Sequence, residues 1–182
     1  MLNIGVLISG GGTNLQAIID ETKSGGINGT VKLVISNKEN AYGLERARLS
    51  KIKAVYETDE DKIIEILKEN NIDLIVLAGY LKIITPKFVD EFRNKIINIH
   101  PSLIPSFCGK GYYGEKVHQG VIDYGAKVTG ATVHFVDEGA DTGAIIMQEA
   151  VNVEQDDDAK SLAKRVLEVE HRILKESIRL FC

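Results

Sequence analysis

Asn98 and His100 lie two residues apart at the end of an apolar segment, residues 95–99, and their side chains suit the chemistry of an acyl group. The β-branched content of that segment predicts a buried strand, and Pro101 biases His100 away from helical backbone. Alternate residues of a strand point to one side, so we expect both side chains to face one cavity. A carboxamide donor beside an imidazole can stabilise a carbonyl oxygen that becomes negative during attack. The alternative is a polar strand end that only caps a turn.

A glycine-rich segment, residues 9–14, follows the first predicted strand and opens the first predicted helix. Backbone N–H groups and the helix dipole at such a place form an anion site. The segment lacks the Lys-Ser/Thr of a Walker A loop, and Leu15 stands where a dinucleotide fingerprint has its third glycine. The second predicted strand ends without the acidic residue that binds a ribose of NAD. The loop therefore predicts a site for a single phosphate group, with a turn that only packs the helix against the sheet as the alternative.

Several acidic residues lie in the segment 134–143, which joins two predicted strands. Among Asp137, Glu138 and Asp141, it is Asp141 that is flanked by residues favouring a tight turn. A carboxylate there can raise the pKa of a neighbouring imidazole, hold its tautomer or pass protons through water. The sequence leaves open whether Asp141 reaches His100 or is a solvated turn aspartate.

The elements that would position these residues alternate between strand-like and helix-like segments, with no internal repeat, linker or low-complexity run. A chain of 182 residues that is 44% hydrophobic can bury one full core. We predict one α/β domain, residues 1–182, with a mostly parallel, doubly wound sheet, an antiparallel edge formed by the last two strands, and a C-terminal helix. The predicted strands are residues 3–8, 31–36, 53–55, 74–78, 96–99, 128–136 and 144–151, and the predicted helices are residues 14–22, 43–50, 59–69, 86–92, 114–124 and 159–180.

Composition restricts the partners. A net charge of −4 gives no general attraction to nucleic acid or to an anionic membrane surface. The apolar N-terminal segment, residues 1–8, is too short for a signal or membrane segment and has no basic leader, which predicts a cytoplasmic protein. Neither Cys108 nor Cys182 belongs to a CxxC motif or disulfide framework. We interpret the acidic run 156–158 as a solvated helix start and expect no metal site.

The remaining nucleophile and imidazole candidates carry weaker signals. Cys108 lies in a glycine-rich loop, residues 106–114, without an activating sequence context, so we expect no covalent catalysis by its thiol. His118 and His171 lie in predicted helices and are expected to be surface or packing residues. His134 lies in a predicted strand and is expected to be a structural histidine with satisfied hydrogen bonds.

Four segments together resemble the folate-dependent formyltransferase family, and within it the phosphoribosylglycinamide formyltransferases: residues 8–16, 78–84, 98–105 and 134–143. Their order and spacing are similar to those of the family over essentially the whole chain. The resemblance implies a Rossmann-like formyltransferase fold. It also implies that the chain transfers the formyl group of 10-formyltetrahydrofolate to the amine of 5'-phosphoribosylglycinamide (glycinamide ribonucleotide), an early step of de novo purine biosynthesis.

Carried over residue by residue, the resemblance implies roles for individual side chains. The implied catalytic group is Asn98, His100 and Asp141. The substrate phosphate would lie at Gly12, Thr13 and Asn14, and the ribose or amine end of the substrate at Glu170. Folate contacts, largely through backbone groups, would come from Lys82, Ile83, Ile84, Asp137, Glu138, Gly139, Ala140 and the neighbouring Asp141.

Two features depart from the family pattern, and other activities remain to be weighed. Lys82 stands where many members have arginine, so the planar, bidentate guanidinium is replaced by an ammonium group that acts as a point charge. Residues 106–114 differ from the Pro-Gly-containing loop usual in the family, but they remain compatible with a mobile flap over the active site.

A formyltetrahydrofolate hydrolase or a methionyl-tRNA formyltransferase would carry an additional domain, which disfavours both activities for a chain of this length. A non-catalytic nucleotide-phosphate sensor would lack part of the catalytic group, all of which is present.

Overall fold

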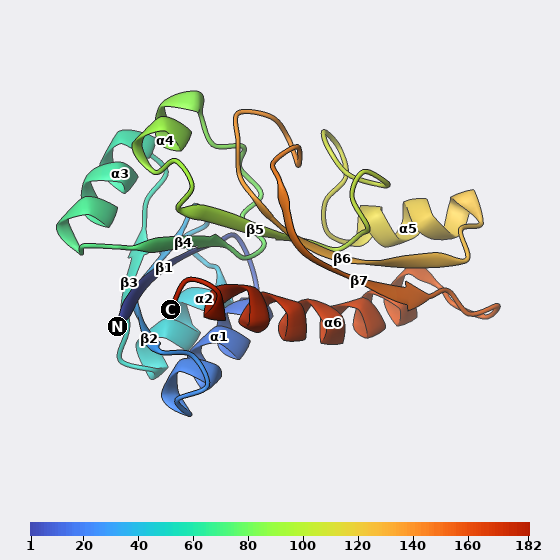
Figure 1. Ribbon diagram of the computed structural model, residues 1–182, viewed down its shortest axis with the longest axis horizontal. Coiled ribbons are helices and arrows are strands. Elements are labelled where there is room, and N and C mark those ends of the chain that lie inside the picture. Colours follow the sequence, from blue (N-terminus) through green and yellow to red (C-terminus); the bar gives the residue numbers. More distant parts are fainter.

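The computed structural model describes residues 1–182 and contains one seven-stranded sheet with helices on both faces (Figure 1). The strands lie in the order β3-β2-β1-β4-β5-β6-β7, and those from β1 to β5 run parallel. β6 and β7 are antiparallel, which confirms the predicted antiparallel edge. The strands are β1 (Leu2–Ile8), β2 (Gly29–Ser36), β3 (Lys53–Tyr56), β4 (Leu74–Leu77), β5 (Ile96–His100), β6 (Val128–Phe135) and β7 (Ile145–Asn152).

Six helices complete the chain, and their ends follow local capping chemistry. Asp59 caps its helix by accepting hydrogen bonds from the backbone of Asp61 and Lys62. Pro86 occupies a first-turn position, and Asp158 forms a reciprocal capping box with Ser161. All predicted elements form, with bounds within two residues of those expected. The helices are α1 (Thr13–Lys23), α2 (Tyr42–Leu49), α3 (Glu60–Glu69), α4 (Pro86–Glu91), α5 (Glu115–Tyr124) and α6 (Ala159–Arg179).

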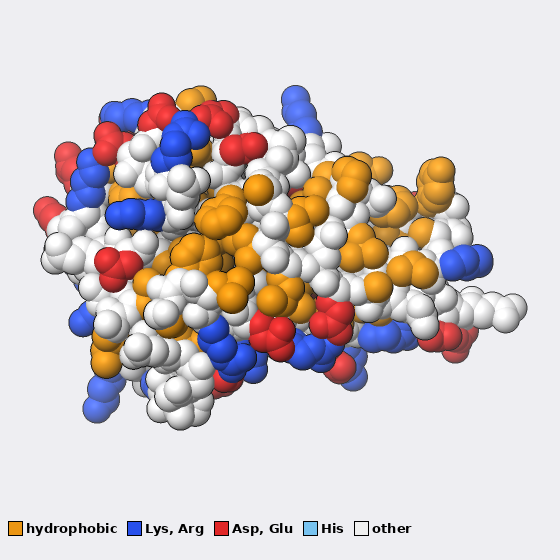
Figure 2. Space-filling view, viewed as in Figure 1, with side chains coloured by type: hydrophobic (Ala, Val, Ile, Leu, Met, Phe, Trp, Pro, Cys, Tyr) orange, Lys and Arg blue, Asp and Glu red, His pale blue; other side chains and the backbone are white.

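Two hydrophobic layers hold the helices against the sheet. Alternation along β1 sends Ile4, Val6 and Ile8 into the layer beneath α1, α2, α5 and α6, and Leu7 into the layer beneath α3 and α4. In Figure 1, α6 runs along one face of the sheet, while α3 and α4 lie over the other. The outer faces of these helices carry much of the charge, and hydrophobic side chains gather between them (Figure 2). None of the helices combines the length and apolar character required to cross a membrane.

The winding of the sheet reverses between β1 and β4, which lie side by side. Ligands of open α/β sheets bind where such a reversal occurs, outside the carboxyl ends of the strands. The loops that leave these two strands are tied together there: Ser9 N–H donates to the Gly79 carbonyl at 3.0 Å, and Leu81 N–H donates to Ser9 Oγ at 2.9 Å. The fold therefore joins the glycine-rich loop to the segment that follows β4.

Candidate active site

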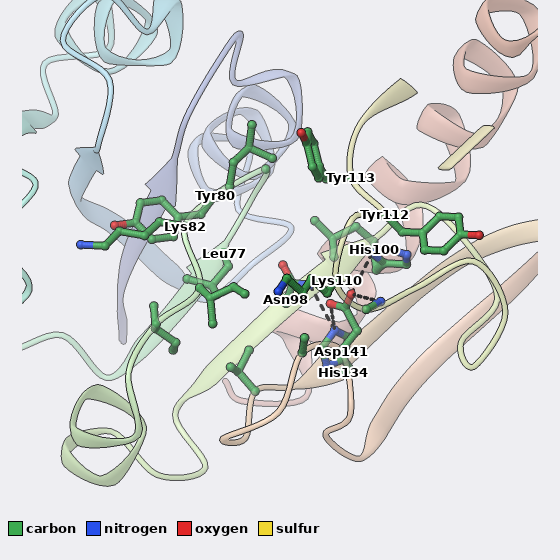
Figure 3. A pocket seen from close by; sticks show the side chains of 18 of the residues that line it. Leu77, Tyr80, Lys82, Asn98, His100, Lys110, Tyr112, Tyr113, His134 and Asp141 are labelled. Atoms are coloured by element: carbon green, nitrogen blue, oxygen red, sulfur yellow. Dashed lines mark hydrogen bonds and ion pairs between the residues drawn. The ribbon is translucent and has the colours of Figure 1, made fainter. Parts of the chain in front are cut away.

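A cavity of about 280 Å³ lies beside the carboxyl ends of β4 and β5 (Figure 3). Asn98 and His100 project into it from β5, on the opposite side from Ile97 and Ile99, which belong to the core beneath α6. The expectation that alternate residues of one strand share a cavity is therefore met. β4 contributes Leu77, β6 contributes His134, and Ile99 and Pro101 add to the lining at the end of β5. Loops supply residues 79–84, 109–114, 136–137 and 139–141.

Asp141 lies between the imidazoles of His100 and His134 in the lining of this cavity (Figure 3). Its Oδ2 is 3.7 Å from His100 Nδ1, and its Oδ1 is 3.6 Å from His134 Nε2. The backbone N–H of Gly109 donates to Oδ2 at 2.9 Å. The carboxylate is thus held by the loop that covers the cavity, and the structure brings it to His100.

Burial and charge set the proton affinities of this group. Burial lowers the pKa of His100, against the opposing effects of the Phe107 carbonyl and the Asp141 charge. Burial alone would raise the pKa of Asp141, but interactions with His134, Gly109 and His100 outweigh it and lower that pKa. Asp141 is therefore ionised at neutral pH, and its charge favours a proton on the neighbouring His100 ring.

The two nitrogens of His100 have different surroundings. Nε2 lies 2.9 Å from the carbonyl oxygen of Phe107, and because a carbonyl only accepts, this nitrogen carries a hydrogen. Nδ1 faces Asp141 at 3.7 Å, which is longer than a hydrogen bond. Nδ1 is therefore the ring nitrogen left to interact with a bound molecule.

The glycine-rich loop leads into the first turn of α1. At one position in this loop, the close approach of α2 leaves room only for glycine. Gly12 has φ 72°, and a Cβ atom there would lie 2.8 Å from the Cα of Gly43. Arg46 donates from Nε to the Gly11 carbonyl at 2.7 Å, while its guanidinium stacks on Tyr42. α2 therefore fixes the shape of this loop at the helix N-terminus, where backbone N–H groups favour an anion.

Asn14 and Glu170 form a separate buried pair. Asn14 Nδ2 donates to Glu170 Oε2 at 2.8 Å, and the side-chain oxygen of Asn14 is buried without a partner. Burial raises the pKa of Glu170 to about 7. The resemblance grouped Asn14 with the phosphate site, but its side chain points to α6, so only its backbone remains at the loop.

The residues assigned to folate divide between the cavity and the surface. Glu138 does not line the cavity and instead forms an ion pair with Arg93. Lys82 does line it, and its Nζ donates to the Thr58 carbonyl at 2.9 Å. The phosphate-loop residues and Glu170 lie outside the lining of this cavity. The folate-assigned residues that line it are Lys82, Ile83, Ile84, Asp137, Gly139, Ala140 and Asp141.

Sequence reasoning missed several lining residues. His134 was expected to be only structural, yet it lies directly across from Asn98 in the β5–β6 register. That pairing was the signal that could have found it, because cross-strand partners share a face. Lys110, Tyr112 and Tyr113 carry no comparable sequence signal and reach the cavity through the path of their loop. Of the two histidines expected at the surface or in packing, His118 is buried and His171 is partly buried.

Cys108 lies in the same loop without taking a place in the cavity lining. Burial raises the pKa of its thiol, and the nearby charge of Asp141 raises it further. The thiol is therefore less acidic than usual, which agrees with the expectation that it is not a nucleophile.

The fold is α/β, and the polar groups that line the cavity suit transfer of an acyl group. Comparison with known proteins identifies the family. The formyl transferase family model matches residues 2–178, and the chain belongs to the formyl transferase family. Within that family it groups with the phosphoribosylglycinamide formyltransferases.

Three comparisons support this grouping. Phosphoribosylglycinamide formyltransferase of Haemophilus influenzae is 45% identical over 100% of this chain and 87% of its own length. The chloroplastic enzyme of Arabidopsis thaliana is 41% identical over 98% of this chain, which spans only 65% of that longer protein. The crystal structure of glycinamide ribonucleotide transformylase 1 from Symbiobacterium toebii has a TM-score of 0.93 at 44% identity, covering 100% of this chain and 87% of that one.

Proposed function

We propose that this protein transfers the formyl group of 10-formyltetrahydrofolate to the amine of glycinamide ribonucleotide, in de novo purine biosynthesis. Residues 1–182 act as one formyltransferase domain in the cytoplasm, on small-molecule substrates. The observation that carries the proposal is the convergence of Asn98, His100 and Asp141 in one cavity beside the folate-assigned segments. A carboxamide, an imidazole and an ionised carboxylate together match the needs of a carbonyl carbon under attack by an amine.

In the proposed reaction, the neutral amine of the substrate adds to the formyl carbon and forms a tetrahedral intermediate. An N–H of Asn98 and a protonated His100 stabilise the oxygen that becomes negative. Asp141 supports the charged imidazole, because its Oδ2 faces His100 Nδ1 at 3.7 Å. Asp141 also assists removal of a proton from the attacking nitrogen through water. Collapse of the intermediate breaks the bond to the folate nitrogen, which takes up a proton in place of the one lost by the attacking nitrogen and leaves as tetrahydrofolate.

The folate lies in the cavity of about 280 Å³ in this proposal, against residues 82–84 and the loop 137–141. The exposed side chains of Leu81 and Ile83 offer apolar surface at this segment. The folate is a co-substrate rather than a resident cofactor, and no step requires a metal. Because the proposed contacts to the folate are made largely by backbone groups, a lysine can occupy position 82, where many relatives have arginine.

The nucleotide substrate lies along the edge between the glycine-rich loop and the catalytic group. Its phosphate binds the backbone of Gly12, Thr13 and Asn14 at the start of α1, where the helix dipole favours an anion. The ribose or amine end of the substrate lies toward Glu170, whose carboxyl group accepts a hydrogen bond from Asn14 Nδ2 at the start of α1. Two bound reactants then meet as parts of one complex, which removes the entropy cost of their encounter.

One assay tests this proposal against its competitors. Purified protein is mixed with 10-formyltetrahydrofolate, and formation of tetrahydrofolate is followed with and without glycinamide ribonucleotide. A transferase releases folate product only when the nucleotide is present and forms formylated nucleotide in equal amount. Product formation without the nucleotide would indicate a hydrolase, and binding of the nucleotide with no product would indicate a phosphate sensor.

A further inference from the structure

The Asn98 side chain has a single hydrogen-bond partner, His134, whose Nε2 lies 3.1 Å from Asn98 Nδ2. The other nitrogen of that ring, Nδ1, lies 2.7 Å from the carbonyl oxygen of Phe135. Because a carbonyl only accepts, Nδ1 carries the hydrogen, and Nε2 of the neutral ring is left as an acceptor. Asp141 Oδ1 also faces Nε2, but at 3.6 Å it lies beyond hydrogen-bond distance, so Asn98 Nδ2 is the closer group. His134 is 2% exposed, so this acceptor is held in a fixed, buried position.

An acceptor at that position distinguishes the two orientations of a carboxamide. Rotation by 180° would exchange the nitrogen and oxygen of Asn98 and place Oδ1 against the lone pair of His134 Nε2, with no hydrogen between them. In the observed orientation one N–H of Asn98 points to His134, as Figure 3 shows. Its second N–H has no partner in the chain, and the side chain lines the cavity.

We propose that His134 is a positioning residue that holds the Asn98 carboxamide in its donor orientation toward the formyl oxygen. This inference rests on the proposed formyl transfer. In the rotated state Asn98 would present a carbonyl oxygen to the developing negative charge and repel it. An apolar side chain could fill the same buried space, so the hydrogen-bonding capacity of His134, and not its volume, is what the site uses.

Two substitutions separate these properties. His134→Leu keeps a side chain of similar size without an acceptor, and His134→Gln keeps an oxygen that can reach the place of Nε2. We expect His134→Leu to lower kcat roughly ten- to a hundredfold. We expect KM for both substrates to stay within about threefold and His134→Gln to recover most of the rate. In an Asn98→Ala background, His134→Leu should have a much smaller effect, because no carboxamide remains to be oriented and only the approach to Asp141 is lost.

The inference is overturned if His134→Leu lowers kcat equally in both backgrounds, if His134→Gln is as slow as His134→Leu, or if KM carries the loss. A second measurement is independent of turnover. The side-chain amide protons of Asn98, identified as the pair missing from the NMR spectrum of Asn98→Ala, should exchange with solvent faster in His134→Leu and stay protected in His134→Gln. Absence of formyl transfer by the unsubstituted protein would refute the proposed function, while these amide signals would still decide the role of His134.

Discussion

At the scale of single residues, the cavity joins polar groups that come from distant parts of the chain. Asn98 contacts His134, His134 approaches Asp141, and Asp141 approaches His100. Buried polar groups linked in this way depend on one another for hydrogen bonds and for charge. The side chains of this series should therefore respond to substitution in distinguishable ways.

Removal of either proposed oxyanion partner should slow the chemical step. We expect His100→Ala and Asn98→Ala each to reduce kcat by about a hundredfold or more, because a donor aimed at developing charge is lost. The affinity for glycinamide ribonucleotide should change little, since its phosphate binds at the separate glycine-rich loop. Steady-state kinetics on the folded variants provides the check, and near-normal turnover in either one would refute its assignment.

Asp141→Asn should lower the pKa of His100 while preserving the shape of the side chain. The charge of Asp141 raises that pKa, so its removal leaves the lowering effect of burial less opposed. NMR titration of the His100 ring protons measures the change, and activity should fall strongly as the imidazolium loses support. Asp137→Asn, in the same loop but bonded to Gly139 and Thr142, is the matched control and should leave the titration in place. An unchanged His100 titration in Asp141→Asn would disprove the coupling.

The residue types of the catalytic group could be read from the sequence, but their contacts could not. The two-residue spacing of Asn98 and His100 in a strand determined that they share a side. The approach of Asp141 to His100 depends on a loop in which Asp141 itself has φ 57°, a conformation that local sequence does not specify. The role of His134 required the register between β5 and β6, which is a property of two segments together.

At the scale of elements, the glycine-rich loop depends on the closeness of α1 and α2. Gly43 N–H donates to the Gly10 carbonyl at 3.0 Å, and Arg46 reaches Gly11. A helix placed this near leaves no space for a side chain at Gly12. The shape of the anion site is therefore set by the neighbouring helix as well as by the loop.

Gly12→Ala should weaken binding of the nucleotide substrate. Its Cβ would lie 2.8 Å from Gly43, and φ 72° strains any side chain. We expect the affinity for glycinamide ribonucleotide to fall on the order of tenfold, with folate binding preserved because its assigned segments are separate. Calorimetric titration with each ligand tests this two-site arrangement, and Gly10→Ala, where a Cβ meets open space, is the control. Equal loss of both ligands, or unchanged nucleotide affinity, would contradict the arrangement.

The helices and strands were predictable because most of them carry explicit boundary signals. Asp59, Pro86 and the Asp158–Ser161 pair begin helices, and Gly125 ends α5 with φ 75°. Residues 106–114 were recognisable only as a flexible, glycine-rich loop. Their path was not predictable, since it follows from contacts with His100 and Asp141 that span the fold.

At the scale of the whole molecule, α6 packs one face of the sheet and carries a buried carboxyl group. Glu170 lies among apolar residues of that helix and has Asn14 as its hydrogen-bond partner. The doubly wound sheet, its antiparallel edge and the C-terminal helix were expected from the alternation of elements in the sequence. The burial of Glu170 did not follow from it, because burial depends on α1 and α6 lying together.

The stability of the unliganded protein should depend on the protonation of Glu170. The pKa rises from 4.5 in the unfolded chain to about 7 in the fold, so the folded state binds the proton more tightly. The stabilising effect is complete below about pH 4.5 and is lost as pH rises through about 7, a change on the order of 3 kcal/mol. Glu170→Gln should therefore lose less stability than the unsubstituted protein between pH 5 and about 9.

Denaturant unfolding across this pH range measures the difference in the free energy of unfolding. Glu168→Gln, on the exposed side of the same helix, is the matched control and should follow the unsubstituted protein. Parallel curves for Glu170→Gln and the unsubstituted protein would show that the carboxyl group is not buried in solution.

The loop at residues 106–114 is connected to the catalytic group only through its backbone: the Phe107 carbonyl meets His100, and the Gly109 N–H meets Asp141. Side chains of the loop can therefore change in evolution without disturbing either bond. Lys110, Tyr112 and Tyr113 nevertheless line the cavity. An inhibitor built to contact these three side chains would gain selectivity for proteins with this loop sequence, and substitutions there would weaken it while leaving the backbone bonds to His100 and Asp141 in place.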